Sequence, residues 1–261
     1  MKKIIILFMT LLTFSLYAQD KNTIKGNLFN SYRDELSWDF FDDSIEITKY
    51  TEELGLQVKT VNYTYINKGP YSILKTEDNG LSTEYVALLH ENKYFVLLYQ
   101  KDSQKPLEDG FFGKNSLLFS TTTKYTTKNY LTEGKVKYLP QNLKDLSIGK
   151  PWVEDSEGAG IGDTIIIQNS QIIESLVISN GFVSYKTSTY YNNNRVKKLR
   201  ITNKNNDSES FETILPDNAI PTDIIIPFKT KELILEIIEV YKGDKYDDTC
   251  INFILCKTPP Y

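Results

Sequence analysis

One short segment of the chain combines aromatic rings with amide and guanidinium groups. It runs from Tyr190 and Tyr191 through three asparagines to Arg195. Planar amides can pair with two hydroxyls, arginine offers a rigid fork of donors, and an aromatic ring can stack on a sugar face. The pattern predicts glycan contacts by Tyr190, Tyr191, Asn193, Asn194 and Arg195. In the alternative interpretation, the asparagines adopt turn conformations and Arg195 holds the loop in shape.

Two further segments offer side chains of the same kinds. Trp152 follows Pro151 and could stack on a sugar ring, or it could instead plug the end of the folded domain. The segment Tyr241–Asp248 adds Tyr241, Tyr246 and Asp247, whose polar groups could bind sugar hydroxyls or a cation. Such acidic loops also serve simply to keep a strand connection hydrated. We include Trp152, Tyr241, Tyr246 and Asp247 in the predicted glycan site.

Catalytic motifs are missing from the sequence. A Ser-His-Asp triad would have to use His90, the single histidine, and no serine lies in a nucleophile elbow. We expect His90 to lie on the surface of a hairpin. Paired carboxylates could hydrolyse a glycoside, but with 34 acidic residues their spacing gives no support for one pair over another. The sequence therefore predicts a protein that is not an enzyme, without a catalytic cofactor.

The composition indicates a β-rich protein that does not bind nucleic acid. The 261 residues are 40% apolar and 13% aromatic, with 18 tyrosines, which is typical of β-structure and excludes a wholly disordered chain. The formal net charge is −4, without a block of basic residues. An acidic chain of this kind is a poor nucleic-acid binder.

The elements that must position these residues are short strands in two groups. Thr83–Lys101 reads as a hairpin with Glu91–Lys93 as its turn. We expect an N-terminal domain over 20–138, a β-meander or small β-barrel, then a linker over 139–148. A β-sandwich follows over 149–261, and residues 147–261 should fold alone. A change of alternation between Ile237 and Ile238 predicts a β-bulge. The predicted strands are Ser44–Lys49, Leu56–Asn67, Tyr71–Lys75, Thr83–His90, Tyr94–Lys101, Ser116–Ser120, Thr164–Gln168, Ile172–Asn180, Val196–Asn203, Ser210–Leu215, Asp223–Phe228, Glu232–Lys242 and Thr249–Cys256.

The first 19 residues have the pattern of a signal peptide. Lys2 and Lys3 precede the apolar run Ile4–Leu16, which is too short to span a membrane, and a small-residue cleavage site ends near Ala18. We therefore expect an exported protein without a membrane span, located in the periplasm, at the cell surface or outside the cell.

Cys250 and Cys256 are the only cysteines. On one strand they lie about 20 Å apart, whereas a disulfide needs Cα atoms within about 7 Å. A bond would form only if the strand folded back near Asn252. We expect two unpaired, largely buried thiols.

The second half resembles the discoidin-type domain that accompanies bacterial NAD glycohydrolase toxins, the NADase-type glycan-binding domain. This resemblance covers residues 147–257 and implies a jelly-roll sandwich of the galactose-binding-like kind, with ligand loops at one end. It implies glycan binding and not NAD cleavage, and the first half resembles no family. The alternative function is a structural or protein-binding component of the cell envelope that does not bind a glycan. The segments that carry the resemblance are Pro151–Glu154 with Gly158–Ile167, Ile178–Phe182, Tyr190–Lys197, and Val240–Gly243 with Lys245–Ile251.

The closing strand departs from the pattern of galactose-binding-like domains. Those domains often carry an Ile-Ser-Glu-Ile strand whose glutamate can help to bind calcium, whereas Asn252 and Phe253 occupy these positions here. Calcium prefers several oxygen ligands, usually including carboxylates. Asp244, Asp247 and Asp248 are close in sequence, so a structural calcium stays an open alternative.

Overall fold

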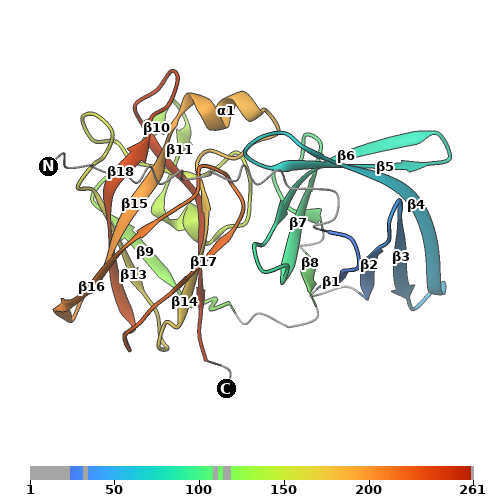
Figure 1. Ribbon diagram of the computed structural model, residues 1–261, viewed down its shortest axis with the longest axis horizontal. Coiled ribbons are helices and arrows are strands. Elements are labelled where there is room, and N and C mark those ends of the chain that lie inside the picture. Colours follow the sequence, from blue (N-terminus) through green and yellow to red (C-terminus); the bar gives the residue numbers. More distant parts are fainter. Residues whose placement is uncertain (1–23, 32–34, 108–110, 114–118, 260–261) are drawn as a thin grey trace, which may run out of the picture.

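The computed structural model describes residues 24–31, 35–107, 111–113 and 119–259, with side chains except at 111–113. The molecule is built almost entirely of β-strands, arranged as a barrel and a sandwich that lie side by side (Figure 1). This confirms the predicted all-β fold class. The predicted signal peptide and most of the predicted strand 116–120 lie outside the described residues.

The N-terminal half is a closed antiparallel barrel, in which β8 pairs back to β1. In β4, Val61, Tyr63 and Tyr65 point into the barrel and are buried, and the intervening residues are exposed, because side chains alternate across a strand. The predicted hairpin is confirmed as β6 and β7. The strands are β1 (Leu28–Ser31), β2 (Leu36–Phe40), β3 (Ser44–Thr51), β4 (Gly55–Asn67), β5 (Ser72–Asp78), β6 (Leu81–Leu89), β7 (Phe95–Gln100) and β8 (Phe111–Gly113).

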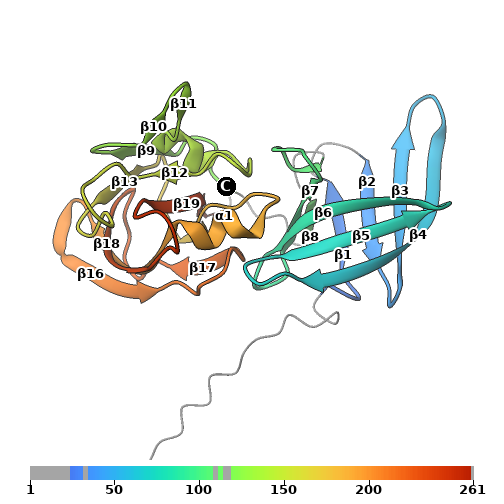
Figure 2. The ribbon, with the colours of Figure 1, turned by 90° about the horizontal axis from the view of Figure 1, so that it is seen from above.

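The C-terminal half is a β-sandwich with the strand order β17-β14-β19-β15-β18-β13-β9, with β12 beside β19 and β16 beside β15 (Figure 2). Its core holds mostly isoleucine, leucine and valine side chains. The strands are β9 (Lys124–Thr127), β12 (Trp152–Val153), β13 (Thr164–Gln168), β14 (Ser175–Asn180), β15 (Asn194–Asn203), β16 (Asn206–Ile214), β17 (Thr222–Ile225), β18 (Glu232–Tyr241) and β19 (Thr249–Lys257).

The predicted bulge is confirmed by the pairing of β15 with β18. Val196 pairs with Val240, but Leu199 pairs with Ile237, and the register shifts between them. A bulge turns the following side chains to the other face, which explains the change of alternation in the sequence.

The sandwich begins earlier than the sequence indicated. We expected 124–127 in the N-terminal domain, but β9 pairs with β13 of the sandwich. The predicted linker contains a 3-10 helix, Pro140–Lys144, whose Leu143 is fully buried in the sandwich core. A small hairpin of β10 (Thr132–Glu133) and β11 (Val136–Lys137) lies between them in sequence. The sequence did not identify β9 as part of the sandwich, because its Thr, Lys and Tyr residues are equally common in exposed loops.

Barrel and sandwich share a third apolar cluster. Tyr71, just before β5, and Val86 and Leu97 of β6 and β7 pack with Val177 and Phe253 of β14 and β19. Hydrogen bonds cross the same boundary: the Tyr71 hydroxyl donates to the Ser184 carbonyl at 2.6 Å, and the Ala219 amide donates to the Pro70 carbonyl at 2.7 Å. The two halves therefore form one continuous packed unit.

His90 is buried in this boundary, so the prediction of a surface position was wrong. Its ring is fully buried, stacked against Phe95, and its Nε2 lies 3.2 Å from Asp223 Oδ1 on β17. Burial raises the pKa of the Asp223 carboxyl, but hydrogen bonds from His90 and Asn92 outweigh it and leave the pKa below its usual value. The hairpin turn faces the sandwich instead of solvent, which the sequence of the hairpin alone does not reveal.

Both cysteines are unpaired and buried, as predicted. Burial raises the pKa of the Cys250 thiol well above its usual value and that of Cys256 to about 11. Thiolate chemistry therefore has no support at either position. No helix in the described part of the chain is long and apolar enough to cross a membrane.

Candidate functional site

Trp152 belongs to the interior of the sandwich. Its side chain is fully buried in the core cluster, and β12 holds its backbone opposite Ile251 of β19. Trp152 therefore fills the end of the sandwich core, as in the second of its two predicted roles. A ring in this position offers no exposed face on which a sugar could stack.

Arg195 is also a structural residue. The side chain is 5% exposed and forms a bidentate pair with Asp217, with Nε 3.0 Å from Oδ1 and Nη2 2.8 Å from Oδ2. Its Nη1 donates to the carbonyls of Asn193 and Lys242, both at 3.0 Å. Burial lowers the pKa of this guanidinium, but Asp217 raises it more strongly. All three nitrogens of the guanidinium therefore donate to oxygens of the protein itself.

The tyrosines before Arg195 lie on a short helix, α1 (Thr187–Asn192), where the sequence indicated a loop. Tyr190 is fully buried, and the Arg195 guanidinium lies 5.3 Å from its ring centre. Tyr191 is 36% exposed, but its hydroxyl packs on Gly69 in the β4–β5 turn, where a Cβ would clash with it. Both rings therefore serve the packing between the sandwich and the barrel.

The two asparagines at the end of α1 use their amides within the protein. Asn194 is 1% exposed; its Nδ2 donates to the Asp247 carbonyl at 2.5 Å, and its Oδ1 accepts from the Gly243 amide at 2.7 Å. Asn193 donates to the Thr189 carbonyl at 2.8 Å. Both amides therefore hold backbone in place and are not directed at a ligand.

These buried groups converge on the connection between β18 and β19, residues 242–248, which we call the end loop. The backbone amides of Asp244, Lys245 and Tyr246 donate to the carbonyls of Tyr191 and Asn192 at 2.8–3.1 Å. A Cβ on Gly243 would come within 2.6 Å of the Asn192 carbonyl oxygen, so only glycine permits this approach. The conformation of the end loop is thus fixed from α1 and β15.

The side chains of the end loop point outward. Tyr246 is 43% exposed, Lys245 and Asp247 are exposed, and the Lys245 ammonium lies 4.8 Å from the centre of the Tyr246 ring. Tyr241, before the loop, is half-buried, and its hydroxyl donates to the Leu215 carbonyl at 2.9 Å. A rigid loop here presents an aromatic ring between a cation and an anion.

A second loop, 154–163, lies beside the end loop. The buried Glu154 carboxylate accepts from the amides of Ser156 at 2.6 Å and Thr249 at 3.0 Å, and the Thr249 hydroxyl donates to the Ala159 carbonyl at 2.8 Å. Burial raises the pKa of Glu154, although both amide hydrogen bonds lower it. Ile161, 64% exposed, is presented at this end of the sandwich.

Asp248 lies among other carboxylates at this end of the sandwich. Burial raises the pKa of Asp248, and the nearby carboxylates of Glu133, Asp155 and Asp247 raise it further. Across the described residues, no three His, Cys, Asp or Glu side chains are arranged to hold a metal ion.

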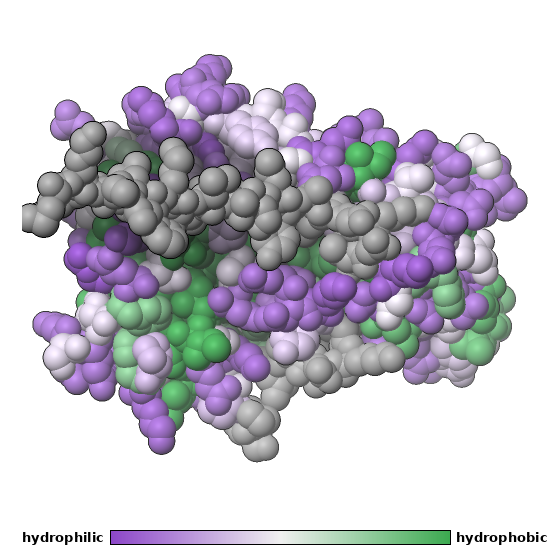
Figure 3. All heavy atoms as spheres, in the orientation of Figure 1, coloured by the Kyte–Doolittle hydropathy of each residue, from purple (hydrophilic) through white to green (hydrophobic). Residues whose placement is uncertain are grey.

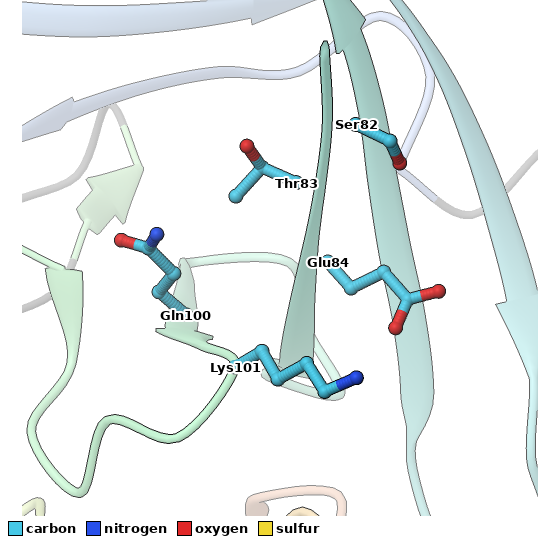
Figure 4. Close-up of a pocket in the computed structure, with 5 residues that line it drawn as sticks. All are labelled: Ser82, Thr83, Glu84, Gln100 and Lys101. Atoms are coloured by element: carbon cyan, nitrogen blue, oxygen red, sulfur yellow. The ribbon is translucent and has the colours of Figure 1, made fainter.

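A hollow of about 300 Å³ lies away from these loops, on the barrel, and is lined by Ser82, Thr83, Glu84, Gln100 and Lys101. Figure 4 shows Thr83 and Gln100 on one side of β6, and Glu84 and Lys101 on the other. The Tyr185 hydroxyl already donates to Glu84 at 2.5 Å. Polar groups that point apart do not surround one ligand, so we place the candidate site at the end loop.

Sequence reasoning missed two residues on which this site depends. Asp217, the partner of Arg195, lies in the β16–β17 connection with no motif around it. Glu154 stood inside a segment of the resemblance, but its role depends on the amide of Thr249, 95 residues later. Only the fold brings these groups together.

Comparison with known proteins follows the same division of the chain. A family model described as "NAD glycohydrolase translocation F5/8 type C domain" matches residues 119–257, more than half of the chain. A search of curated proteins gave no match. The family match starts close to β9 and so agrees with the earlier start of the sandwich.

Solved structures that match this chain include two cryo-EM structures of a mutant arabinofuranosyltransferase AftD from Mycobacteria, 15% identical with TM-scores of 0.37 and 0.38. These matches cover 54% of this chain and 11% of the transferase. An X-ray structure of GH31 CBM32-2 bound to GalNAc is 10% identical, with a TM-score of 0.37, and 54% of this chain covers 99% of it. The resemblance inferred from the sequence is confirmed by the family match: this chain belongs to the family of NAD glycohydrolase translocation F5/8 type C domains.

Proposed function

We propose that the sandwich recognises a glycan without catalysis, and that the end loop makes the contact. Tyr246 stacks on a sugar face, Asp247 accepts hydrogen bonds from hydroxyls and Lys245 donates to them. Loop 154–163 forms the neighbouring wall. Family membership supports a binding role, because the discoidin-type fold carries ligand loops at one end of the sandwich.

The fixed backbone of the end loop is the observation that carries this proposal. Its amides and carbonyls are held by α1, Asn194 and Arg195, whereas Lys245, Tyr246 and Asp247 are left exposed. Binding residues commonly sit on loops that a rigid scaffold positions. Ordering a mobile loop costs free energy on binding, and a loop that is already ordered avoids this cost.

The predicted glycan residues therefore divide by role. Tyr246 and Asp247 are contact residues, and Lys245 joins them. Asn193, Asn194 and Arg195 are positioning residues, because their polar groups are engaged in holding the end loop and α1. Trp152, Tyr190, Tyr191 and Tyr241 support the scaffold.

We also propose that the protein is exported. The support is the pattern of Lys2 and Lys3 followed by Ile4–Leu16. N-terminal sequencing of the natively produced protein should give a start near Gln19 or Asp20. A retained Met1 on the exported protein would contradict the proposal.

The test of glycan recognition is an array probed with the mature chain, followed by titration of each glycan that binds. We expect Tyr246→Ala to weaken binding roughly fivefold or more, since an aromatic contact contributes about 1 kcal/mol or more. Phe41→Ala is the matched control, because Phe41 is similarly exposed, at 48%, on the barrel. If no glycan binds, or if both variants bind as the parent does, the proposal is wrong. Release of free sugar from the array would contradict the absence of catalysis.

A further inference from the structure

The barrel has an uncovered sheet edge on β4. Residues 55–61 pair only with β3, because β5 begins to pair with β4 at Asn62. No backbone hydrogen bond from another described segment reaches the outer edge of 55–61. In Figure 2 the hairpin of β3 and β4 projects beyond its neighbours in the barrel.

The exposed face of this hairpin is apolar. Tyr50, Leu56 and Val58 share one face, since Tyr50 pairs with Leu56 and Thr48 with Val58, and they are 46%, 67% and 56% exposed. Leu54, at the tip, is 64% exposed. Figure 3 shows apolar surface at this end of the molecule, over β3 and β4.

Free strand edges usually carry protection such as proline, a bulge or several charges. Residues 55–61 contain no proline and one charged residue, Lys59, which forms an ion pair with Asp78 of its own chain at 2.5 Å. An unprotected edge with an apolar face has the properties of a surface that pairs with another strand.

We propose that this edge pairs antiparallel with the same edge of a second copy of the chain, about a two-fold axis at Gln57. In that register Leu56 of each copy lies opposite Val58 of the other, and Lys59 lies opposite Gly55. Direct opposite pairs in an antiparallel sheet share one face, so the two apolar faces become continuous. The pairing stops before Thr60, where the β5–β6 turn of each copy approaches.

Charge complementarity favours a second copy as the occupant. The hairpin from Lys49 to Lys59 carries two lysines and two glutamates, Glu52 and Glu53, so two copies do not repel each other there. In the proposed register Lys59 of each copy comes next to the acidic tip of the other. In this register no residue lies directly opposite a residue of the same charge in the other copy. A strand of an unrelated protein would meet this condition only by chance.

Sedimentation velocity of the mature chain, from about 1 µM to about 500 µM, tests the proposal. We expect a reversible dimer that Leu56→Lys and Val58→Lys convert to a monomer with unchanged unfolding temperature, because both side chains are exposed. Ile225→Lys is the control, since Ile225 is 77% exposed on the edge strand β17, and it should leave the dimer intact. A parent chain that stays monomeric over the whole range overturns the proposal.

A cysteine cross-link tests the register separately. Residue 57 faces itself across the axis, so Gln57→Cys should form a disulfide-linked dimer under mild oxidation, because opposite Cα atoms lie about 4.5–5.5 Å apart. Thr60→Cys, which would not face itself, should not. Both native thiols are buried, so a cross-link reports the introduced cysteine. Cross-linking through Thr60→Cys but not Gln57→Cys overturns the register.

Discussion

Replacement of Arg195 with alanine separates a positioning residue from a contact residue. The change removes the bidentate pair with Asp217 and leaves the carbonyls of Asn193 and Lys242 without their shared donor. Breaking a buried ion pair costs about 3–5 kcal/mol. Asp217 is 37% exposed and can be rehydrated in part, so we expect the lower end, about 3 kcal/mol.

This loss should be visible in thermal unfolding. For a chain of this size about 1 kcal/mol corresponds to roughly 2–4 °C, so Arg195→Ala should lower the Tm by roughly 6–12 °C. Arg200→Ala is the matched control. Arg200 also bridges two carboxylates, of Glu212 and Glu236, but its side chain is 43% exposed, and its loss should change the Tm little.

Glycan affinity gives the second readout. If Arg195 acts only through the end loop, Arg195→Ala should lower the Tm and weaken binding together. A variant with the parent Tm and no glycan binding would refute the reasoning, because it would show that the guanidinium contacts the ligand directly.

Three further predictions follow from the packing and charges. Gly243→Ala should weaken glycan binding at least tenfold and lower the Tm, because a Cβ within 2.6 Å of the Asn192 carbonyl oxygen meets fixed backbone and must shift the end loop. Unchanged affinity and Tm would show that the loop has room. Ion pairs with Lys197, Lys198 and Arg200 hold the pKa values of Glu212 and Glu239 below their usual value. These pairs therefore stabilise the fold fully above the pKa of unfolded glutamate, and this stability should be lost as the pH falls through the lowered pKa values. Urea unfolding of the parent and of Glu239→Gln at decreasing pH measures the loss, and an equal pH dependence of both proteins would contradict the prediction. Contrary to the expectation from the sequence, a fragment 147–261 should not unfold cooperatively, because it lacks β9 and Leu143 of the core, whereas a fragment 119–261 should. Circular dichroism measures both, and a cooperative transition of 147–261 would show that these elements are dispensable.

The sequence was sufficient for most of the fold because alternation is a local property. Strands such as β4 and β18 can be recognised in the sequence because apolar and polar residues alternate along them. The bulge near Ile238 can be recognised as well, because the alternation shifts there by one residue. The start of the sandwich was missed because β9 is short and polar. Its assignment depends on pairing with β13, about 40 residues later.

The candidate site was less predictable, because residue type does not reveal which way a side chain faces. Arg195, Asn194 and Tyr190 have the chemistry of sugar binding, but the same donors and rings also stabilise backbone and helix packing. Their structural role is set by Asp217, Lys242 and Gly243, which contact Arg195 or Asn194 from distant positions in the sequence. The exposed contact residues of the set, Tyr246 and Asp247, were predicted beside the buried ones and could not be separated from them.

NMR shift mapping with a glycan that binds the mature chain tests the central claim most directly. We predict that the backbone amide signals of residues 243–248 and of loop 154–163 shift with a common saturation curve, whereas those of the barrel strands β1–β4 stay unchanged. Shifts confined to the barrel, or to the buried segment around Tyr190 without the end loop, would contradict the account.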